Sequence, residues 1–267
     1  MKKPVAVSIA GSDPSAGAGI QADLRMFSAL GVYGTTVVTA LTAQNPDRVT
    51  GVLGVEAGFV RAQINALFEA LPIAAMKTGM LWSSEIITTV AHTAHENPAV
   101  ALVVDPVMIA TSGAQLVAHK AIDTYKRELL PRCTLMTPNI DEAQVLLGGE
   151  TIDAQNQEDA ARTLGETFGC AVLLKGGHLT GDPIDLLWEE GRVHSWKKKR
   201  LHSVNSHGSG CTLSAAVTAF LAHGQTLPKA VQAAIQTVHT ALLNPVTPAP
   251  GLHLAGLEET SPNHFKD

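Results

Sequence analysis

The sequence contains little cysteine. Its 267 residues include only Cys133, Cys170 and Cys211, and no two of them form a Cys-x-x-Cys pair. An odd count without that spacing argues against a disulfide scaffold and against a zinc site, and it is typical of a reducing compartment. The 11 histidines also lack metal-ligand spacing, so none of them is assigned to a metal.

Long apolar runs and a strong charge of one sign are also lacking. No stretch approaches the length of a transmembrane helix. The apolar run Val5–Ala10 is short and leads into Gly-Ser-Asp-Pro, which favours a first strand over a signal peptide. The formal net charge of −5 argues against nucleic-acid and membrane partners. The one basic run, 197–200, is interpreted as a solvated strand edge or turn. We expect a soluble, cytoplasmic protein.

What the sequence does contain is an alternation of short apolar runs with longer helical patterns. This predicts βαβ units, and therefore an α/β fold with a mostly parallel sheet covered on both faces. The length and the 45% hydrophobic content suit one large core, so residues 1–267 are expected to form a single domain with an irregular tail over 244–267. The predicted strands are Val5–Ala10, Thr36–Leu41, Ile73–Lys77, Ala101–Asp105, Thr134–Thr137, Ala171–Lys175 and an edge hairpin of Asp185–Trp188 with Arg192–Trp196.

Helical periodicity fills the intervals between these strands. The predicted helices are Ile20–Leu30, Val60–Ala70, Ser84–His95, Ala118–Leu129, Gln157–Phe168, one around Leu213–Leu221 and one from Thr226 to Leu243.

Unusual residues gather at the predicted carboxyl ends of the strands. In an open parallel sheet that edge is where ligands bind. The residues are Gly11, Gln44, Gly79, Asp105, Asn139 and Lys175. Together they outline a site.

The segment 205–212, Asn-Ser-His-Gly-Ser-Gly-Cys-Thr, opens directly into a predicted helix. The backbone N–H groups of Gly208, Ser209, Gly210 and Cys211 would converge at a helix N-terminus, which suits the charge on a transferring phosphoryl group. The same position predicts a lowered pKa for the Cys211 thiol, as a base or nucleophile needs. The alternative is a glycine-rich turn followed by a buried cysteine.

A second glycine loop, 10–20, is no Walker A loop because no Lys-Ser/Thr follows its final glycine. It fits a loop closing over a small substrate. Asp23 lies on the apolar stripe of the helix that follows, so its carboxylate needs a partner. It could grip a substrate hydroxyl or act as a structural hydrogen-bond acceptor.

Further polar residues suit a ring and a phosphate. The Gln44 amide could read the edge of a pyrimidine or pyridine ring, or be solvated. Asp105, Asn139 and Glu142 could share Mg²⁺, although Asn139 and Glu142 also fit a helix capping box. Lys175 could neutralise a phosphate or sit in an ordinary turn.

Seven segments, in order, resemble the hydroxymethylpyrimidine/phosphomethylpyrimidine kinases of thiamine biosynthesis, in the pyridoxal-kinase branch of the ribokinase-like fold. They are AGSDPSAGAGIQAD (10–23), TALTAQN (39–45), MKTGML (76–81), VVDPVM (103–108), LMTPNIDEA (135–143), LLKGGH (173–178) and NSHGSGCTLSAA (205–216). No single motif is specific, but the combination is.

The resemblance implies a three-layer α/β/α fold, commonly a homodimer, that uses ATP and Mg²⁺ to phosphorylate the pyrimidine hydroxymethyl group and then the monophosphate. It implies that Cys211 stands where most ribokinase-like enzymes keep a catalytic Asp. The other implied roles are pyrimidine binding by Gly11, Asp23, Gln44, Met80 and Val107, Mg²⁺ and phosphate binding by Asp105, Asn139 and Glu142, and nucleotide binding by Lys175.

Three departures from the family pattern concern nucleotide or phosphate handling. Thr111 and Ile235 replace frequent lysines, and 252–261 replaces an expected Gly-His-Gly segment. Two alternatives therefore stay open beside the pyrimidine kinase: a pyridoxal kinase, and a pyrimidine-binding homologue with weakened catalysis.

Overall fold

A nine-stranded sheet forms the centre of the protein, in the order β3-β2-β1-β4-β5-β6-β7-β8-β9. The computed structural model describes residues 3–46, 48–108, 119–179, 181–200, 208–249 and 252–257. The strands are β1 (Val5–Ser12), β2 (Tyr33–Gln44), β3 (Val49–Gly54), β4 (Ile73–Thr78), β5 (Ala101–Val104), β6 (Leu135–Met136), β7 (Ala171–Leu174), β8 (Ile184–Glu189) and β9 (Arg192–Lys197).

The sheet is parallel in its middle and antiparallel at both edges. All pairings from β2 through β1, β4, β5 and β6 to β7 are parallel. The pairings β2–β3, β7–β8 and β8–β9 are antiparallel. The mostly parallel sheet and the edge hairpin expected from the sequence are thereby confirmed. The central strands are mostly apolar because both of their faces are buried, with polar exceptions such as Ser8 on β1 and Lys77 on β4.

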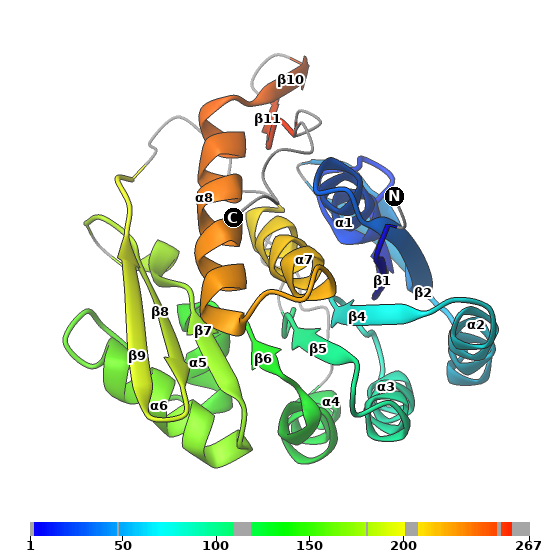
Figure 1. Ribbon diagram of the computed structural model, residues 1–267, viewed down its shortest axis with the longest axis horizontal. Coiled ribbons are helices and arrows are strands. Elements are labelled where there is room, and N and C mark those ends of the chain that lie inside the picture. The colour runs from blue at the N-terminus through cyan, green and yellow to red at the C-terminus, as the bar shows by residue number, and fades with distance from the viewer. Residues whose placement is uncertain are drawn as a thin grey trace.

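Helices cover both faces and give three layers (Figure 1). On one face α1 (Gly19–Ala29), α7 (Ser209–Ala222) and α8 (Leu227–Leu243) pack together around a shared apolar cluster. The helices that build the cluster on the other face are α2 (Ala57–Ala70), α3 (Ser84–Glu96), α4 (His119–Thr124), α5 (Ile140–Leu146) and α6 (Gln157–Phe168).

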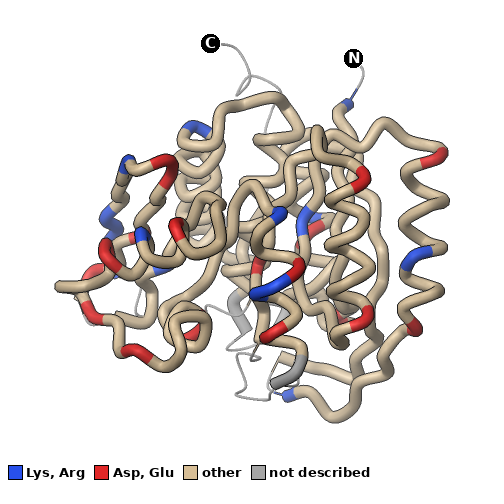
Figure 2. The backbone as a smooth tube through the Cα atoms, turned by 90° about the horizontal axis from the view of Figure 1, so that it is seen from below, with Lys and Arg blue, Asp and Glu red and all other residues tan. Residues whose placement is uncertain are grey.

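Short helical segments complete these layers. A π-helical segment (Tyr125–Leu129) and a 3₁₀ turn (Leu130–Arg132) continue α4, and a second 3₁₀ turn (Gly176–His178) follows β7. Charged residues of both signs are spread over the chain (Figure 2). Within the described residues, no helix is both long and apolar enough to cross a membrane.

Three regions differ from the sequence prediction. β2 runs on to Gln44 and pairs with β3, an unpredicted edge strand whose two glycines and half-exposed residues hide its pattern. α5 was also missed, since only its capping residues were recognised. Where an irregular tail was expected, β10 (Val246–Ala249) and β11 (Leu252–Leu254) form a two-stranded antiparallel sheet.

Candidate active site

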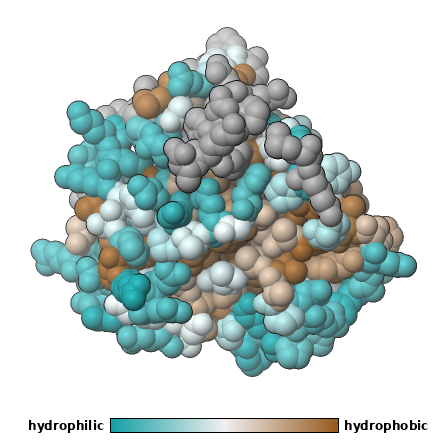
Figure 3. Space-filling model, in the orientation of Figure 1, coloured by the Kyte–Doolittle hydropathy of each residue, from teal (hydrophilic) through white to brown (hydrophobic). Residues whose placement is uncertain are grey.

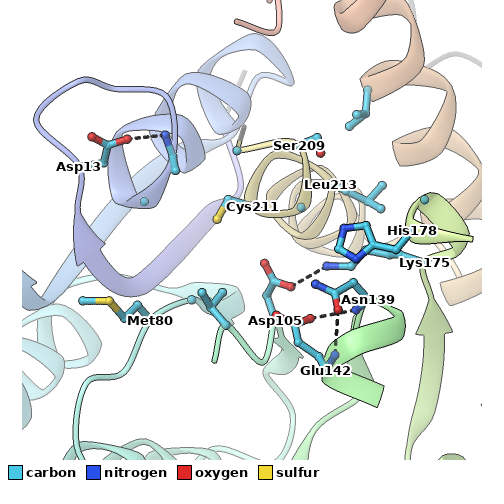
Figure 4. A pocket seen from close by; sticks show the side chains of 18 of the residues that line it. Asp13, Met80, Asp105, Asn139, Glu142, Lys175, His178, Ser209, Cys211 and Leu213 are labelled. Atoms are coloured by element: carbon cyan, nitrogen blue, oxygen red, sulfur yellow. Dashed lines mark hydrogen bonds and ion pairs between the residues drawn. The ribbon is translucent and has the colours of Figure 1, made fainter. Parts of the chain in front are cut away.

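A pocket of about 910 Å³ opens at the carboxyl ends of the parallel strands (Figure 4). The glycine loop after β1, the ends of β2, β4 and β7, the loop after β5 and the first turns of α5 and α7 all contribute residues. Apart from Asp23, every site residue expected from the sequence lines the pocket: Gly11, Gln44, Met80, Asp105, Val107, Asn139, Glu142, Lys175, Gly208, Ser209, Gly210 and Cys211. The tertiary fold thus brings together residues drawn from seven segments.

The N-terminus of α7 is built by two glycines that admit close neighbours. Gly208 precedes the helix with φ of 75°, and a Cβ there would stand 1.8 Å from the Gly17 carbonyl oxygen. A Cβ on Gly210 would stand 3.2 Å from Lys175 Nζ. Only glycine therefore fits at 208, where the glycine loop after β1 lies directly on the start of α7. Residues 205–207 of this motif lie outside the described residues.

Cys211 lies in the first turn of α7 and is partly exposed to the pocket. Burial raises the pKa of its thiol to about 11, while Lys77 and a hydrogen bond from the Gly19 backbone N–H pull in the opposite direction. The lowered pKa expected from the helix terminus is therefore wrong. Desolvation outweighs the helix dipole and the nearby cation.

A carboxylate and an ammonium meet at the centre of the pocket. Lys175 Nζ lies 3.0 Å from Asp105 Oδ1, which also accepts a hydrogen bond from Thr137 Oγ1 at 3.0 Å. Burial acts to lower the pKa of Lys175, but Asp105 and Glu142 outweigh it, so the pKa is raised. Ser214 Oγ lies 3.4 Å from Asp105 Oδ2. Among the residues that the structure describes, Asp105 Oδ2 thus has only a long hydrogen-bond contact, and it lies close to the start of α7.

Asn139 and Glu142 form the capping box at the start of α5. Asn139 Oδ1 accepts a hydrogen bond from the Glu142 N–H at 2.8 Å, and Glu142 Oε2 accepts one from the Asn139 N–H at 2.9 Å. Burial raises the pKa of Glu142 to about 7, with Asp105 adding to the effect and Lys175 opposing it. The structural alternative for these residues is confirmed, and both still face the pocket.

The opposite end of the pocket offers an amide and two apolar side chains. Gln44 ends β2, and its Oε1 lies 3.2 Å from Thr42 Oγ1. Met80 lies under Gly11, whose added Cβ would stand 3.0 Å from Met80 Cε. Val107, which follows β5, also lines the pocket. This end suits a small flat ring with polar edges.

Asp23 lies outside the pocket, which corrects its expected contact with a substrate. Its side chain is fully buried, with Lys77 Nζ 2.8 Å from Oδ1 and Ser8 Oγ donating to Oδ2. The carboxylate therefore acts as a structural hydrogen-bond acceptor, the alternative that the sequence left open. Its position on the apolar face of α1 points it at β1 and β4 rather than at the ligand edge.

Asp13 is a loop residue that the sequence reasoning missed. Its carboxylate accepts hydrogen bonds from the Ser15 and Ala18 N–H groups, both at 2.9 Å, and from Ser15 Oγ at 2.7 Å. These bonds fold the glycine loop between β1 and α1 into one shape. The Asp-Pro-Ser sequence was the available signal, since Asp favours such local turns.

The interpretation of the basic run 197–200 as a solvated strand edge or turn is wrong for three of its four residues. Lys198, Lys199 and Arg200 line the pocket, although Lys197 is exposed at the strand edge as expected. Lys198 pairs with Asp185 at 2.6 Å, and Arg200 donates to the carbonyls of the loop after β7. The predicted hairpin was the available signal, because the second strand of a hairpin that follows β7 ends at the same edge of the sheet as β7 does.

Among the three departures, the structure describes the side chain of Ile235. It is buried in the cluster beneath α8 and does not line the pocket. Val238, His239 and Leu242, one and two turns later on α8, do line it. Thr111 and residues 258–261 of the replaced C-terminal segment lie outside the described residues.

The sequence and the fold match one family. The phosphomethylpyrimidine kinase family model matches residues 13–254. The chain belongs to this family. It is therefore a phosphotransferase, and the resemblance noted in its motifs is confirmed.

Relatives agree with this assignment. The kinase is 46% identical over 241 residues to a hydroxymethylpyrimidine/phosphomethylpyrimidine kinase of Rhizobium meliloti, covering 89% of this chain and 90% of that one. It is 43% identical to a thiamine biosynthesis bifunctional protein of Geobacter sulfurreducens, covering 88% of this chain but 48% of that longer protein. The kinase thus spans about half of the bifunctional relative.

Solved structures share the fold. The kinase superposes on an ADP complex of Bacillus subtilis pyridoxal kinase with a TM-score of 0.87 at 31% identity, covering 96% of this chain and 98% of that one. It superposes on the phosphomethylpyrimidine kinase of Clostridium difficile 630 with a TM-score of 0.79 at 37% identity, covering 89% and 98%. The expected fold class is confirmed.

Proposed function

We propose that the protein transfers the γ-phosphoryl group of ATP to the hydroxymethyl group of 4-amino-5-hydroxymethyl-2-methylpyrimidine, and then a second one to the resulting monophosphate. One observation carries this proposal: a ring-sized end with Gln44 and Met80 shares a pocket with Cys211 and the Lys175–Asp105 pair. The names of the Rhizobium and Clostridium relatives support the same substrates.

The pyrimidine lies against Met80 and Val107, and the Gln44 amide pairs with the ring edge because an amide offers a donor and an acceptor side by side. The loop shaped by Asp13 covers the ring. Since Gly17 of that loop touches Gly208, the ring end and the phosphoryl end of the pocket have a fixed relative position. Such positioning is a main contribution to phosphoryl transfer.

The hydroxymethyl oxygen attacks the γ-phosphorus, the bond from that phosphorus to the β-phosphate oxygen breaks, and ADP leaves. The N–H groups at the start of α7 and the Lys175 ammonium stabilise the negative charge on the transferred group. Cys211, in its thiolate form, takes the hydroxyl proton. Asn139 and Lys175 bind the phosphates of the nucleotide.

The donor set fits Mg²⁺ in the mode this ion prefers, which is one or two carboxylates together with substrate phosphates and water. Among the described residues, Asp105 Oδ2 has only a long contact, with Ser214, and the Asp105 charge helps to raise the pKa of Glu142. Asp105 and Glu142 would hold the ion against the phosphates, where it neutralises charge. Within the described residues, no group of three or more His, Cys, Asp or Glu side chains could hold a metal alone.

The working form is a homodimer in the cytoplasm, with the whole chain acting as a single kinase domain. Leu41 and Leu53 are cross-strand neighbours of β2 and β3, and both are exposed. Figure 3 shows hydrophobic residues gathered on the side of the molecule that carries β1, β2 and β4. The three cysteines are free, which suits a reducing compartment. Light scattering of wild type and Leu53→Lys tests the dimer.

Release of ADP from Mg·ATP tests the activity, with 4-amino-5-hydroxymethyl-2-methylpyrimidine, its monophosphate and pyridoxal assayed side by side. We expect turnover with both pyrimidines. Turnover with pyridoxal alone would overturn the proposed substrate and make the protein a pyridoxal kinase. Binding of the pyrimidine without turnover would make it a binding protein.

A further inference from the structure

A buried ion pair lies directly under the pocket and outside its lining. Lys77 of β4 and Asp23 of α1 are fully buried, and Lys77 Nζ lies 2.8 Å from Asp23 Oδ1. Ser8, which stands beside Lys77 on the neighbouring strand β1, donates to the other carboxylate oxygen. Removing two charges from water is costly, and an apolar pair of similar size would often be as stable. The pair therefore calls for a role beyond stability.

The ammonium of this pair reaches the floor of the pocket. A Cβ on Gly79 would stand 3.8 Å from Lys77 Nζ, and Gly79 lines the pocket. Among the residues that the structure describes, Asp23 is the one hydrogen-bond acceptor for Lys77. An ammonium has three donors. Two N–H groups are thus left under the floor, on the side where α7 packs against β4.

We infer that Lys77, held in place by Asp23 and Ser8, is a positioning residue that favours the thiolate form of Cys211 during phosphoryl transfer. This inference rests on the proposed function. Two groups favour the thiolate over the thiol. They are the Lys77 charge and the backbone N–H of Gly19, which donates a hydrogen bond to the sulfur. Because Gly19 begins α1, which also carries Asp23, one helix fixes both contacts.

The charges around Cys211 act in opposite directions. Lys77 on β4 lowers the pKa of the thiol, whereas Asp105 after β5 and Asp23 on α1 raise it. Lys77 has the largest effect of these three charges, and the Lys175 ammonium after β7 also interacts with Cys211. Burial raises the pKa to about 11, so most molecules carry the thiol at neutral pH, and the Lys77 charge increases the fraction that is thiolate.

The test is the rate of alkylation of Cys211 by iodoacetamide between pH 7 and 10, read by peptide mass spectrometry so that Cys133 and Cys170 are resolved. In Lys77→Met we expect the pH profile to move up by about one unit, which slows alkylation about tenfold at a given pH. That variant leaves Asp23 buried without its partner, so the double variant Lys77→Met/Asp23→Asn replaces both charges with neutral side chains. Its pH profile should shift in the same direction by a smaller amount.

A matched control removes an ion pair elsewhere. Arg61→Met/Glu96→Gln deletes a surface pair on α2 and α3 and should leave the profile unchanged. An unshifted profile in the folded double variant would overturn the role of Lys77. The assay reads the thiol without any kinase substrate, so it stands even if the proposed pyrimidine activity fails. If that activity holds, the double variant should lower kcat with little change in the KM for ATP.

Discussion

Lys175 Nζ lies 3.0 Å from Asp105 Oδ1, and this contact joins the end of β7 to the end of β5 across the pocket. The two residues are 70 positions apart in the sequence. Their pairing leaves the ammonium beside the first turn of α7, where phosphate charge would be held.

Replacing this ammonium should impair phosphoryl transfer. Lys175→Met removes a cation next to the transferring group, and a loss of about 10²-fold in kcat is expected for a donor of this kind. Steady-state kinetics with varied ATP would measure it. Lys197→Met, which changes an exposed lysine at the sheet edge, should retain wild-type kinetics. Similar losses in both variants would contradict the assignment.

A side chain at position 208 should push the glycine loop away from the start of α7 and disturb the relative position of the two ends of the pocket. Gly208→Ala puts a Cβ against the Gly17 carbonyl at a residue with positive φ, so turnover should fall at least tenfold. Gly224→Ala is the matched control because its φ is 82° and no atom lies within 4 Å of its added Cβ. It should cost about 1 kcal/mol of stability and keep its activity. Initial rates and thermal melts of both variants decide the matter.

Glu142 should make the stability of the metal-free protein depend on pH. Its folded pKa of about 7 lies above the ordinary glutamate pKa of 4.5, so the folded state holds the proton more tightly than the unfolded state does. The stability that this group contributes is therefore present below pH 4.5 and is lost as the pH rises through 7. Glu142→Gln keeps an oxygen for the capping box and cannot ionise. From pH 5 to 8, the melting temperature of wild type should fall relative to that of Glu142→Gln. A difference that stays constant over this range would refute the prediction.

Cys211→Ala should lower turnover far more than it weakens pyrimidine binding, because the thiolate takes a proton during the reaction and the ring binds at the other end of the pocket. A fall of about 10² in kcat with a nearly unchanged Kd is expected. Single-turnover kinetics and calorimetry measure the two quantities. Equal turnover in wild type and variant would remove Cys211 from the mechanism.

Asp23→Asn should destabilise the fold, since it leaves the buried Lys77 without a counter-charge. Breaking one side of such a pair costs about 3 to 5 kcal/mol. Urea unfolding of the single variant and of Asp23→Asn/Lys77→Met should show that the second substitution restores part of the loss. Additive losses would argue against coupling between the two residues.

The sequence by itself determined the class of fold and most of the pocket. Apolar runs such as Val5–Ala10 alternate with amphipathic helices, which is the pattern of parallel βαβ units. Ligands bind at the carboxyl edge of such sheets. The residues at the ends of the predicted strands could therefore be named in advance, and Asp105, Asn139 and Lys175 do line one pocket.

Only the tertiary structure decided the state and the partners of those residues. The pKa of Cys211 depends on burial and on Lys77, which lies far away in the sequence, so the helix position alone gave the wrong direction. Asp23 was expected to contact the substrate, but it pairs with Lys77 because α1 packs its apolar face on β1 and β4. The basic run after β9 reaches the pocket because the hairpin folds back to the ligand edge. Local patterns fix the elements, whereas desolvation and charge pairing depend on which elements meet.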